Sequence, residues 1–208
     1  MTRLRIKICG LTREADVEAV AALDIDAVGF VLWPGSPRAV TPATAAALGR
    51  ILPPWTARVG VMVTPSVVEA ALAVREGGLS ALQLHGVDDV APFLALHVPL
   101  AWVASLDRAE AATTPAGATL MVDAVDPARH GGTGRVIDWT RAAALAGRER
   151  LILAGGLTAA NVAEAIGRVR PYGVDVSSGV ETAPGLKSSE RLRQFVSAVR
   201  QTPVETRS

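Results

Sequence analysis

The residues with the clearest chemical potential lie where short apolar runs of the sequence end. Cys9 ends the run LRIKIC, and Asp123 ends ATLMVD. A thiol acts as a base through its thiolate, and a carboxyl group is a candidate acid where an apolar setting disfavours its charge. A lone cysteine is more often a small buried hydrophobe, but a strand end followed by Gly10 favours a chemical role. We therefore predict acid/base chemistry by Cys9 and Asp123.

Glycine-rich turns follow other apolar runs later in the chain. Gly155-Gly156 follows LILA, Ser178-Gly179 follows GVDVS, and Gly132 and Gly134 belong to the GGTG that comes after ATLMVD. Such turns leave backbone N–H groups that can bind an anion. Each turn alone is compatible with a purely structural role, but the three follow consecutive predicted strands. The pattern predicts one phosphate site that these turns share.

These residues need elements that bring strand ends together. Apolar runs alternate with alanine-rich stretches of helical pattern along the chain, which predicts parallel strands joined by helices. Eight strands favour a single-domain (β/α)8 TIM barrel over an open doubly wound sheet, and no GxGxxG follows the first strand. Strands are expected at 4–9, 27–32, 58–63, 80–84, 99–104, 118–123, 150–154 and 173–177. Helices are expected at 13–23, 42–50, 66–76, 87–95, 107–112, 138–146, 159–168 and 188–199.

Helix starts and domain bounds follow from the same pattern. Thr12, Thr41 before Pro42, and Thr158 are expected to cap helices. No break in composition marks a second domain, so residues 1–200 are expected to form the barrel and 201–208 a frayed tail.

The composition limits the partners that we expect. Lys and Arg number 21 against 20 Asp and Glu, a formal charge of +1, so nothing favours nucleic acid or a membrane surface. The one cysteine excludes an internal disulfide and any multi-cysteine metal site. No long apolar run or signal peptide is present, and we expect a soluble cytoplasmic protein. The sequence leaves open whether it is a monomer or a homodimer.

In a barrel, the active site lies at the C-terminal ends of the strands, where further polar residues are expected. Arg38 stands in the proline-rich loop WPGSPRAVTP, which could hold its guanidinium over the mouth to bind an anion. Gln83 could line the mouth, whereas the nearby His85 is given no catalytic role. Lys7 shares a strand face with Cys9, and inside a barrel it needs a carboxylate or must lose its charge. Asp123 and Asp175 are its candidate partners, and Asp175 could instead contact the ligand.

The motifs resemble those of phosphoribosylanthranilate isomerase, an enzyme of tryptophan biosynthesis. They occur in the family's order over nearly the whole chain: KICGLT, GFVLWPGSPR, QLHG, VDA with GGTGRVIDW, LAGGLTAANV, and DVSSGVE with PGLK. KICG together with GGTG and DVSSGVE is the specific part. Trp33 stands where a smaller aromatic residue is common.

The resemblance implies an Amadori rearrangement of N-(5-phosphoribosyl)anthranilate to 1-(2-carboxyphenylamino)-1-deoxyribulose 5-phosphate, without a metal or organic cofactor. It implies that Asp123 is the general acid that opens the ribose ring to a Schiff base. Cys9 is then the general base that removes the C2′ proton, and Arg38 binds the anthranilate carboxylate. Phosphate falls on the turns at Gly132 and Gly134, Gly155-Gly156 and Ser178-Gly179.

Three alternatives stay open on sequence grounds. The related isomerase of histidine biosynthesis performs the same rearrangement but uses aspartate where this chain has Cys9. A non-catalytic barrel that binds phosphosugars would need neither Cys9 nor Asp123. A phosphosugar lyase or synthase would rely on a strand-end lysine or glutamate, for which Lys7 and Glu181 are the nearest candidates.

Overall fold

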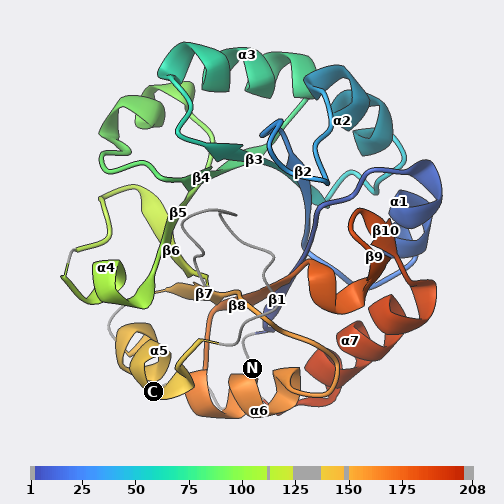
Figure 1. Ribbon diagram of the computed structural model, residues 1–208, viewed down its shortest axis with the longest axis vertical. Coiled ribbons are helices and arrows are strands. Elements are labelled where there is room, and N and C mark those ends of the chain that lie inside the picture. Colours follow the sequence, from blue (N-terminus) through green and yellow to red (C-terminus); the bar gives the residue numbers. More distant parts are fainter. Residues whose placement is uncertain (1–2, 112, 124–136, 148–149, 204–208) are drawn as a thin grey trace.

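The computed structural model of the protein describes residues 3–111, 113–123, 137–147 and 150–203. Eight parallel strands form a closed barrel in chain order, and β1 pairs with both β2 and β8. Figure 1 shows the ring of strands inside a ring of helices. The strands are β1 (Arg5–Cys9), β2 (Ala27–Val31), β3 (Ala57–Val63), β4 (Ala81–His85), β5 (Leu100–Ala104), β6 (Ala118–Val122), β7 (Leu151–Leu153) and β8 (Gly173–Val176). The predicted TIM barrel and its strands are therefore confirmed.

Helices follow the strands along the chain. They are α1 (Glu14–Ala21), α2 (Pro42–Gly49), α3 (Val67–Gly77), α4 (Leu106–Ala111), α5 (Trp139–Ala146), α6 (Val162–Val169) and α7 (Ser189–Gln201), with the 3₁₀ helices η1 (Ala91–Leu96) and η2 (Ser178–Val180). Thr41 caps α2 as predicted, because its hydroxyl accepts a hydrogen bond from the Thr44 N–H at 3.1 Å.

Two other predicted caps are wrong. Thr12 donates its hydroxyl to the carbonyl of Gly185 at 2.7 Å, and α1 has Arg13 at its N-cap without a side-chain bond. The helix predicted to begin after Thr158 starts only at Val162. There the side chain of Asn161 accepts a hydrogen bond from the Thr158 N–H at 2.8 Å, which folds the preceding residues into a turn.

The helix predicted at 87–95 is instead the short 3₁₀ helix η1. The carbonyl of Val87 accepts hydrogen bonds from the Trp102 indole and the Arg108 guanidinium, both at 2.9 Å. It is therefore engaged by side chains instead of by the backbone N–H of a following helical turn. The Asp89 side chain accepts from the Ala91 N–H, and proline follows at the first turn. Side-chain bonds from distant and neighbouring residues, together with the proline, thus displace the α-helical ladder.

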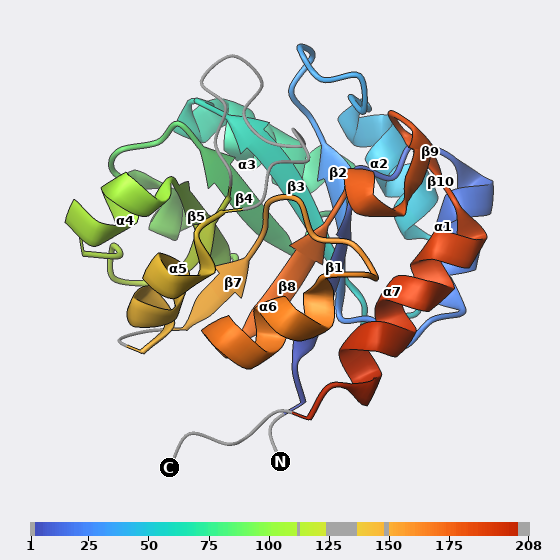
Figure 2. The same ribbon diagram turned by 60° about the horizontal axis from the view of Figure 1, so that its bottom comes forward.

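A β-hairpin that the sequence did not predict follows β8. It consists of β9 (Glu181–Ala183) and β10 (Leu186–Lys187), paired antiparallel. Figure 2 shows this hairpin on the same face of the barrel as the loop that follows β2. The hairpin therefore adds side chains to the end of the barrel where the active site was predicted.

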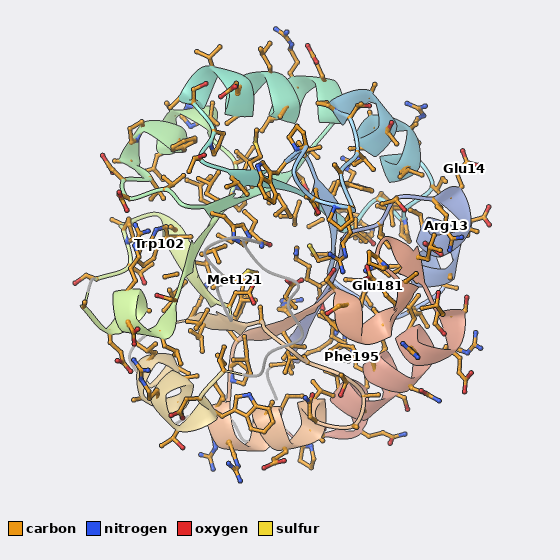
Figure 3. All side chains as sticks on the ribbon, viewed as in Figure 1. Arg13, Glu14, Trp102, Met121, Glu181 and Phe195 are labelled. Carbon is orange, nitrogen blue, oxygen red and sulfur yellow. The ribbon has the colours of Figure 1, made fainter. Side chains whose placement is uncertain are left out.

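The main core lies between the strands and the helices. Ile6, Ile8 and Phe30 point outward into it and are fully buried, as is Phe195 of α7. Burial of each such side chain stabilises the fold by about 1.5–3 kcal/mol. A separate cluster of Val103, Met121 and Ala154 fills part of the strand ring, where Figure 3 shows Met121. Alternation along each strand therefore sends one residue to the core and the next to the barrel interior.

Candidate active site

Cys9 and Lys7 point together into the barrel at β1. A Cβ atom built on Gly29 of the neighbouring β2 would lie 2.6 Å from the Cys9 sulfur and 3.0 Å from the Lys7 Nζ. Both side chains are buried, at 6% and 7% exposure. Because only a residue without a side chain leaves room for them, Gly29 creates the space in which the thiol and the ammonium meet.

Lys7 forms an ion pair with Asp175, with 2.8 Å between Nζ and Oδ1. This settles which of its two candidate carboxylates neutralises the lysine. Burial is the largest single influence on the pKa of Lys7 and lowers it, but the charges of Asp175 and Cys9 and their hydrogen bonds together outweigh burial, so the pKa is raised overall. Lys7 is therefore a cation beside Cys9.

The thiol of Cys9 responds to two opposing influences. Burial raises its pKa, the Lys7 ammonium lowers it, and the outcome is a pKa above the ordinary value. Cys9 therefore rests as a thiol, and Lys7 is the group that stabilises a thiolate when one forms.

Asp123 directly follows β6 at the same end of the barrel as Cys9. Its N–H donates to the carbonyl of Ala104 at 3.4 Å, which continues the β5–β6 ladder by one residue. It lies two positions after Met121, which faces the barrel interior, and its side chain is half-buried. Alternation along the strand thus directs the carboxyl group toward the mouth.

Arg38 reaches back from the loop after β2 over the end of β1. A Cβ on Gly10 would lie 2.6 Å from the Arg38 Cδ, so the arginine stem crosses the residue that follows Cys9. Its guanidinium forms a bidentate pair with Glu181 of β9, with Nε–Oε1 at 2.8 Å and Nη2–Oε2 at 2.7 Å. Figure 3 labels Glu181, the first residue of the hairpin. Sequence analysis singled out Arg38 but did not foresee this carboxylate.

The two described glycine turns meet. A Cβ on Gly179 would lie 1.9 Å from the carbonyl oxygen of Leu157, so the turn after β8 rests directly on the loop after β7. Gly156, Ser178 and Gly179 border one hollow of about 470 Å³, which Arg191 of α7 also borders. The structure thus brings these turns together as predicted, whereas Gly132 and Gly134 lie outside the described residues.

The glycine turn after β7 is held in a fixed shape. Gly155 and Gly156 have φ angles of 86° and 63°, a left-handed conformation that favours glycine. The Asn161 side chain donates to the Gly156 carbonyl at 3.0 Å and accepts from the Thr158 N–H at 2.8 Å. The turn is therefore preorganised by residues of its own loop.

Gln83 is buried at 3% exposure rather than lining the mouth. Its side-chain nitrogen lies 2.8 Å from the Nε2 of His85, also buried. Gln83 borders an interior space of about 370 Å³ together with residues from the amino-terminal ends of the strands, such as Arg5 and Pro99. The prediction that Gln83 lines the mouth is not supported by this placement.

Neither a metal centre nor a membrane segment emerges from the described parts of the chain. Within them, no group of three or more His, Cys, Asp or Glu residues could hold a metal ion. No helix in the same residues is long and apolar enough to cross a membrane.

Comparison with known proteins identifies the family. The family model for N-(5'phosphoribosyl)anthranilate (PRA) isomerase matches residues 6–198. The chain belongs to the phosphoribosylanthranilate isomerase family. An N-(5'-phosphoribosyl)anthranilate isomerase from Chromohalobacter salexigens is 46% identical over 97% of both chains. The phosphoribosylanthranilate isomerase crystal structure from Thermus thermophilus is 36% identical, with a TM-score of 0.86 over 94% of this chain and 98% of that one.

One solved phosphoribosylanthranilate isomerase contains a ligand. It is a complex with reduced 1-(o-carboxyphenylamino)-1-deoxyribulose 5-phosphate, is 30% identical, and has a TM-score of 0.78 over 94% of this chain and 98% of that one. That ligand carries a phosphate and an aryl carboxylate, the two anionic groups that the glycine turns and Arg38 were predicted to bind.

Sequence reasoning missed two residues of the candidate site, Glu181, which binds Arg38, and Lys187, which binds Glu181. Glu181 was weighed only as the catalytic residue of another enzyme class, and Lys187 was noted only within PGLK. The proline-glycine pair between two short extended segments was the available signal, because such a turn predicts a hairpin. A hairpin after β8 would have suggested that both residues return to the mouth.

Proposed function

We propose that this protein is a phosphoribosylanthranilate isomerase of L-tryptophan biosynthesis. It converts N-(5-phosphoribosyl)anthranilate to 1-(2-carboxyphenylamino)-1-deoxyribulose 5-phosphate. Family membership supports the reaction. The observation that carries the mechanism is the buried Cys9 beside the Lys7 cation, at the same barrel end as Asp123.

Asp123 is the general acid in this proposal. It gives its proton to the ribose ring oxygen as the bond from that oxygen to C1′ breaks, which leaves a protonated Schiff base with the anthranilate nitrogen. The proposal requires a carboxyl group that carries a proton when substrate binds, and Asp123 lies half-buried at the end of an apolar strand. Placed acids of this kind contribute about 10²–10⁴-fold to a rate.

Cys9 is the general base that follows. Its thiolate removes the C2′ proton, and the electron pair moves toward the Schiff-base nitrogen to give an enolamine, which tautomerises to the ketose. The adjacent Lys7 ammonium supports this role, because it lowers the cost of a thiolate inside the barrel. Asp123 and Cys9, from different strands, thus act on two atoms bonded to C1′, the ring oxygen and C2′.

Two anchors hold the substrate in this scheme. The phosphate binds to backbone N–H groups of Gly155-Gly156 and Ser178-Gly179, which belong to turns in direct contact. Gly132 and Gly134 are proposed to contribute from the loop after β6. The aryl carboxylate binds Arg38, whose side chain crosses Gly10, the residue after Cys9.

A turnover assay with matched ligand binding tests the proposal. Cys9→Ala and Asp123→Asn should each lower isomerisation by about 10²–10⁴-fold, while the reduced product analogue binds as it does to the unmodified protein. Full activity in either variant would remove that residue from the mechanism. A protein that binds the analogue but turns over no substrate would instead be a phosphosugar-binding barrel.

A further inference from the structure

The Arg38 guanidinium is held along only one of its edges. Its Nε and Nη2 both donate to Glu181, and the two side chains are 11% and 4% exposed. This side-on pairing leaves the other edge, formed by Nη1 and Nη2, with the geometry to bind a second carboxylate. Within the described part of the chain, Nη1 has no hydrogen-bond acceptor. Glu181 therefore fixes the rotation of the guanidinium without using all of its donors.

Lys187 binds the same Glu181 oxygen, Oε1, that accepts from the Arg38 Nε. Its side chain has no exposed surface, and its Nζ lies 2.7 Å from the Glu181 Oε1, 2.6 Å from the Cys9 carbonyl and 3.2 Å from the Ser177 carbonyl. Three acceptors require three N–H donors, which only the charged ammonium has. Lys187 is therefore a buried cation, although burial lowers its pKa.

These contacts connect three parts of the proposed site. Cys9 carries the proposed base, Ser177 precedes the turn at Ser178-Gly179, and Glu181 holds the arginine. The hairpin that carries Lys187 is itself fastened, since Thr12 donates to the Gly185 carbonyl at 2.7 Å. One side chain thus joins the base, the phosphate turn and the arginine.

The charges of this cluster decide what Arg38 offers to a ligand. An arginine paired with a glutamate alone is neutral and attracts a further carboxylate weakly. The Lys187 ammonium restores one net positive charge to Arg38, Glu181 and Lys187 together, in a region of low exposure where charges are poorly screened. One positive charge matches the single aryl carboxylate of the proposed substrate.

We propose that Lys187 is a positioning residue that sets the preference for a carboxylated aryl group. It offsets Glu181, so that Glu181 can orient Arg38 without cancelling its attraction for the substrate. The proposal rests on the proposed function and adds a determinant that does not touch the substrate.

The test compares two ligands that differ only in the carboxylate. One is reduced 1-(o-carboxyphenylamino)-1-deoxyribulose 5-phosphate, and the other is the same molecule with an unsubstituted phenyl ring. The measured quantity is the dissociation constant of the phenyl ligand divided by that of the carboxylated ligand. This ratio isolates the carboxylate contribution, because damage to the phosphate turn or to the fold weakens the binding of both ligands alike. Lys187→Met should lower this ratio by about tenfold or more, the loss expected for a weakened charge-assisted bond.

A second-site variant separates charge from structure. In Lys187→Met with Glu181→Gln, the lost cation and the lost anion balance, and Arg38 again carries one net positive charge. The ratio should return to within about threefold of its original value, a factor that corresponds to less than a typical charged hydrogen bond. A purely structural Lys187 would give no such recovery. Asp26→Asn, which removes a carboxylate from the Arg5 and Arg200 cluster near the amino ends of the strands, is the matched control and should leave the ratio unchanged.

Each outcome bears on one proposal. An unaltered ratio in Lys187→Met, or a ratio still lowered tenfold in the double variant, overturns the role of Lys187. If Lys187→Met does not fold, the double variant is compared with Glu181→Gln alone, which keeps the Lys187 charge. The ratio should be about tenfold higher in Glu181→Gln than in the double variant, and equal ratios overturn the role of Lys187. Absence of turnover in the unmodified protein would instead count against the proposed function.

Discussion

Gly179→Ala is the substitution whose effect the structure defines most sharply. The new Cβ would lie 1.9 Å from the Leu157 carbonyl oxygen and 3.0 Å from its carbon, and both atoms belong to the backbone. Ordinary contact needs about 3.4 Å, so the turn after β8 must move by about 1.5 Å from the loop after β7. Overpacking against a rigid neighbour costs about 1–3 kcal/mol, and the backbone contact argues for the upper part of that range.

Two measurements follow from this displacement. A loss of about 3 kcal/mol lowers the melting temperature of a domain of this size by about 6–12 °C. Because a misplacement of about 1 Å can reduce a rate by about 10²-fold, kcat/KM should fall by about that factor, and the reduced product analogue should bind at least about tenfold more weakly. Thermal unfolding, steady-state turnover and calorimetric titration of the analogue provide the three values.

Gly167→Ala is the matched control. Gly167 lies within α6, and a Cβ there would meet nothing within 4 Å. The substitution should raise stability by about 0.5–1 kcal/mol and leave turnover unchanged, since alanine favours a helix over glycine. If Gly179→Ala melts and binds like the unmodified protein while Gly167→Ala behaves as expected, then the two turns are not pressed together and the shared phosphate cradle is wrong.

Three further outcomes are expected. Gly29→Ala should reduce turnover by at least about tenfold because its Cβ would lie 2.6 Å from the Cys9 sulfur, and unchanged kinetics would show that the thiol sits elsewhere. Because burial raises the pKa of Cys9 despite Lys7, kcat/KM should increase from about pH 7 to about pH 9 as the thiolate forms. In Lys7→Met this increase should move to higher pH. A pH-independent kcat/KM in stopped assays would contradict a thiolate base. Burial raises the pKa of Glu181, but the combined effect of Arg38 and Lys187 in the opposite direction is larger, so the pKa lies below its ordinary value. Glu181 therefore stabilises the fold at pH values above the pKa that its carboxyl group has in the unfolded chain, and this stability should be lost as the pH falls below about 4. Denaturant unfolding between about pH 6 and about pH 3 should then show a smaller loss of stability in Glu181→Gln than in the unmodified protein.

The parts of the fold that the sequence predicts well are those set by local pattern. Each of β1 to β8 begins and ends within one residue of its expected bounds, because branched apolar runs alternate with alanine-rich stretches. The predicted helix at 87–95 was wrong in part because side chains distant in sequence, from Trp102 and Arg108, bind the Val87 carbonyl. A local pattern contains no information about such partners.

The same distinction applies to the site. Cys9, Asp123 and the glycine turns could be assigned to one end of the barrel because strand ends converge in any barrel of parallel strands. The choice of Asp175 over Asp123 as the partner of Lys7 depended on barrel closure, which places β8 beside β1. Lys187 escaped notice because a lysine on a two-residue strand is normally solvated, and only the hairpin brings it to zero exposure beside Glu181.

The pairing of the first strand with the eighth has a consequence for biosynthesis. Lys7 and Asp175 are separated by 168 positions, so the ribosome makes the lysine about ten to thirty seconds before its counterion. During that interval the ammonium keeps its water, and β1 has an unsatisfied edge toward the missing neighbour. Lys7 therefore loses its water in the same late step in which β8 pairs with β1 and closes the barrel. The pocket around the Cys9 thiol forms only in that step.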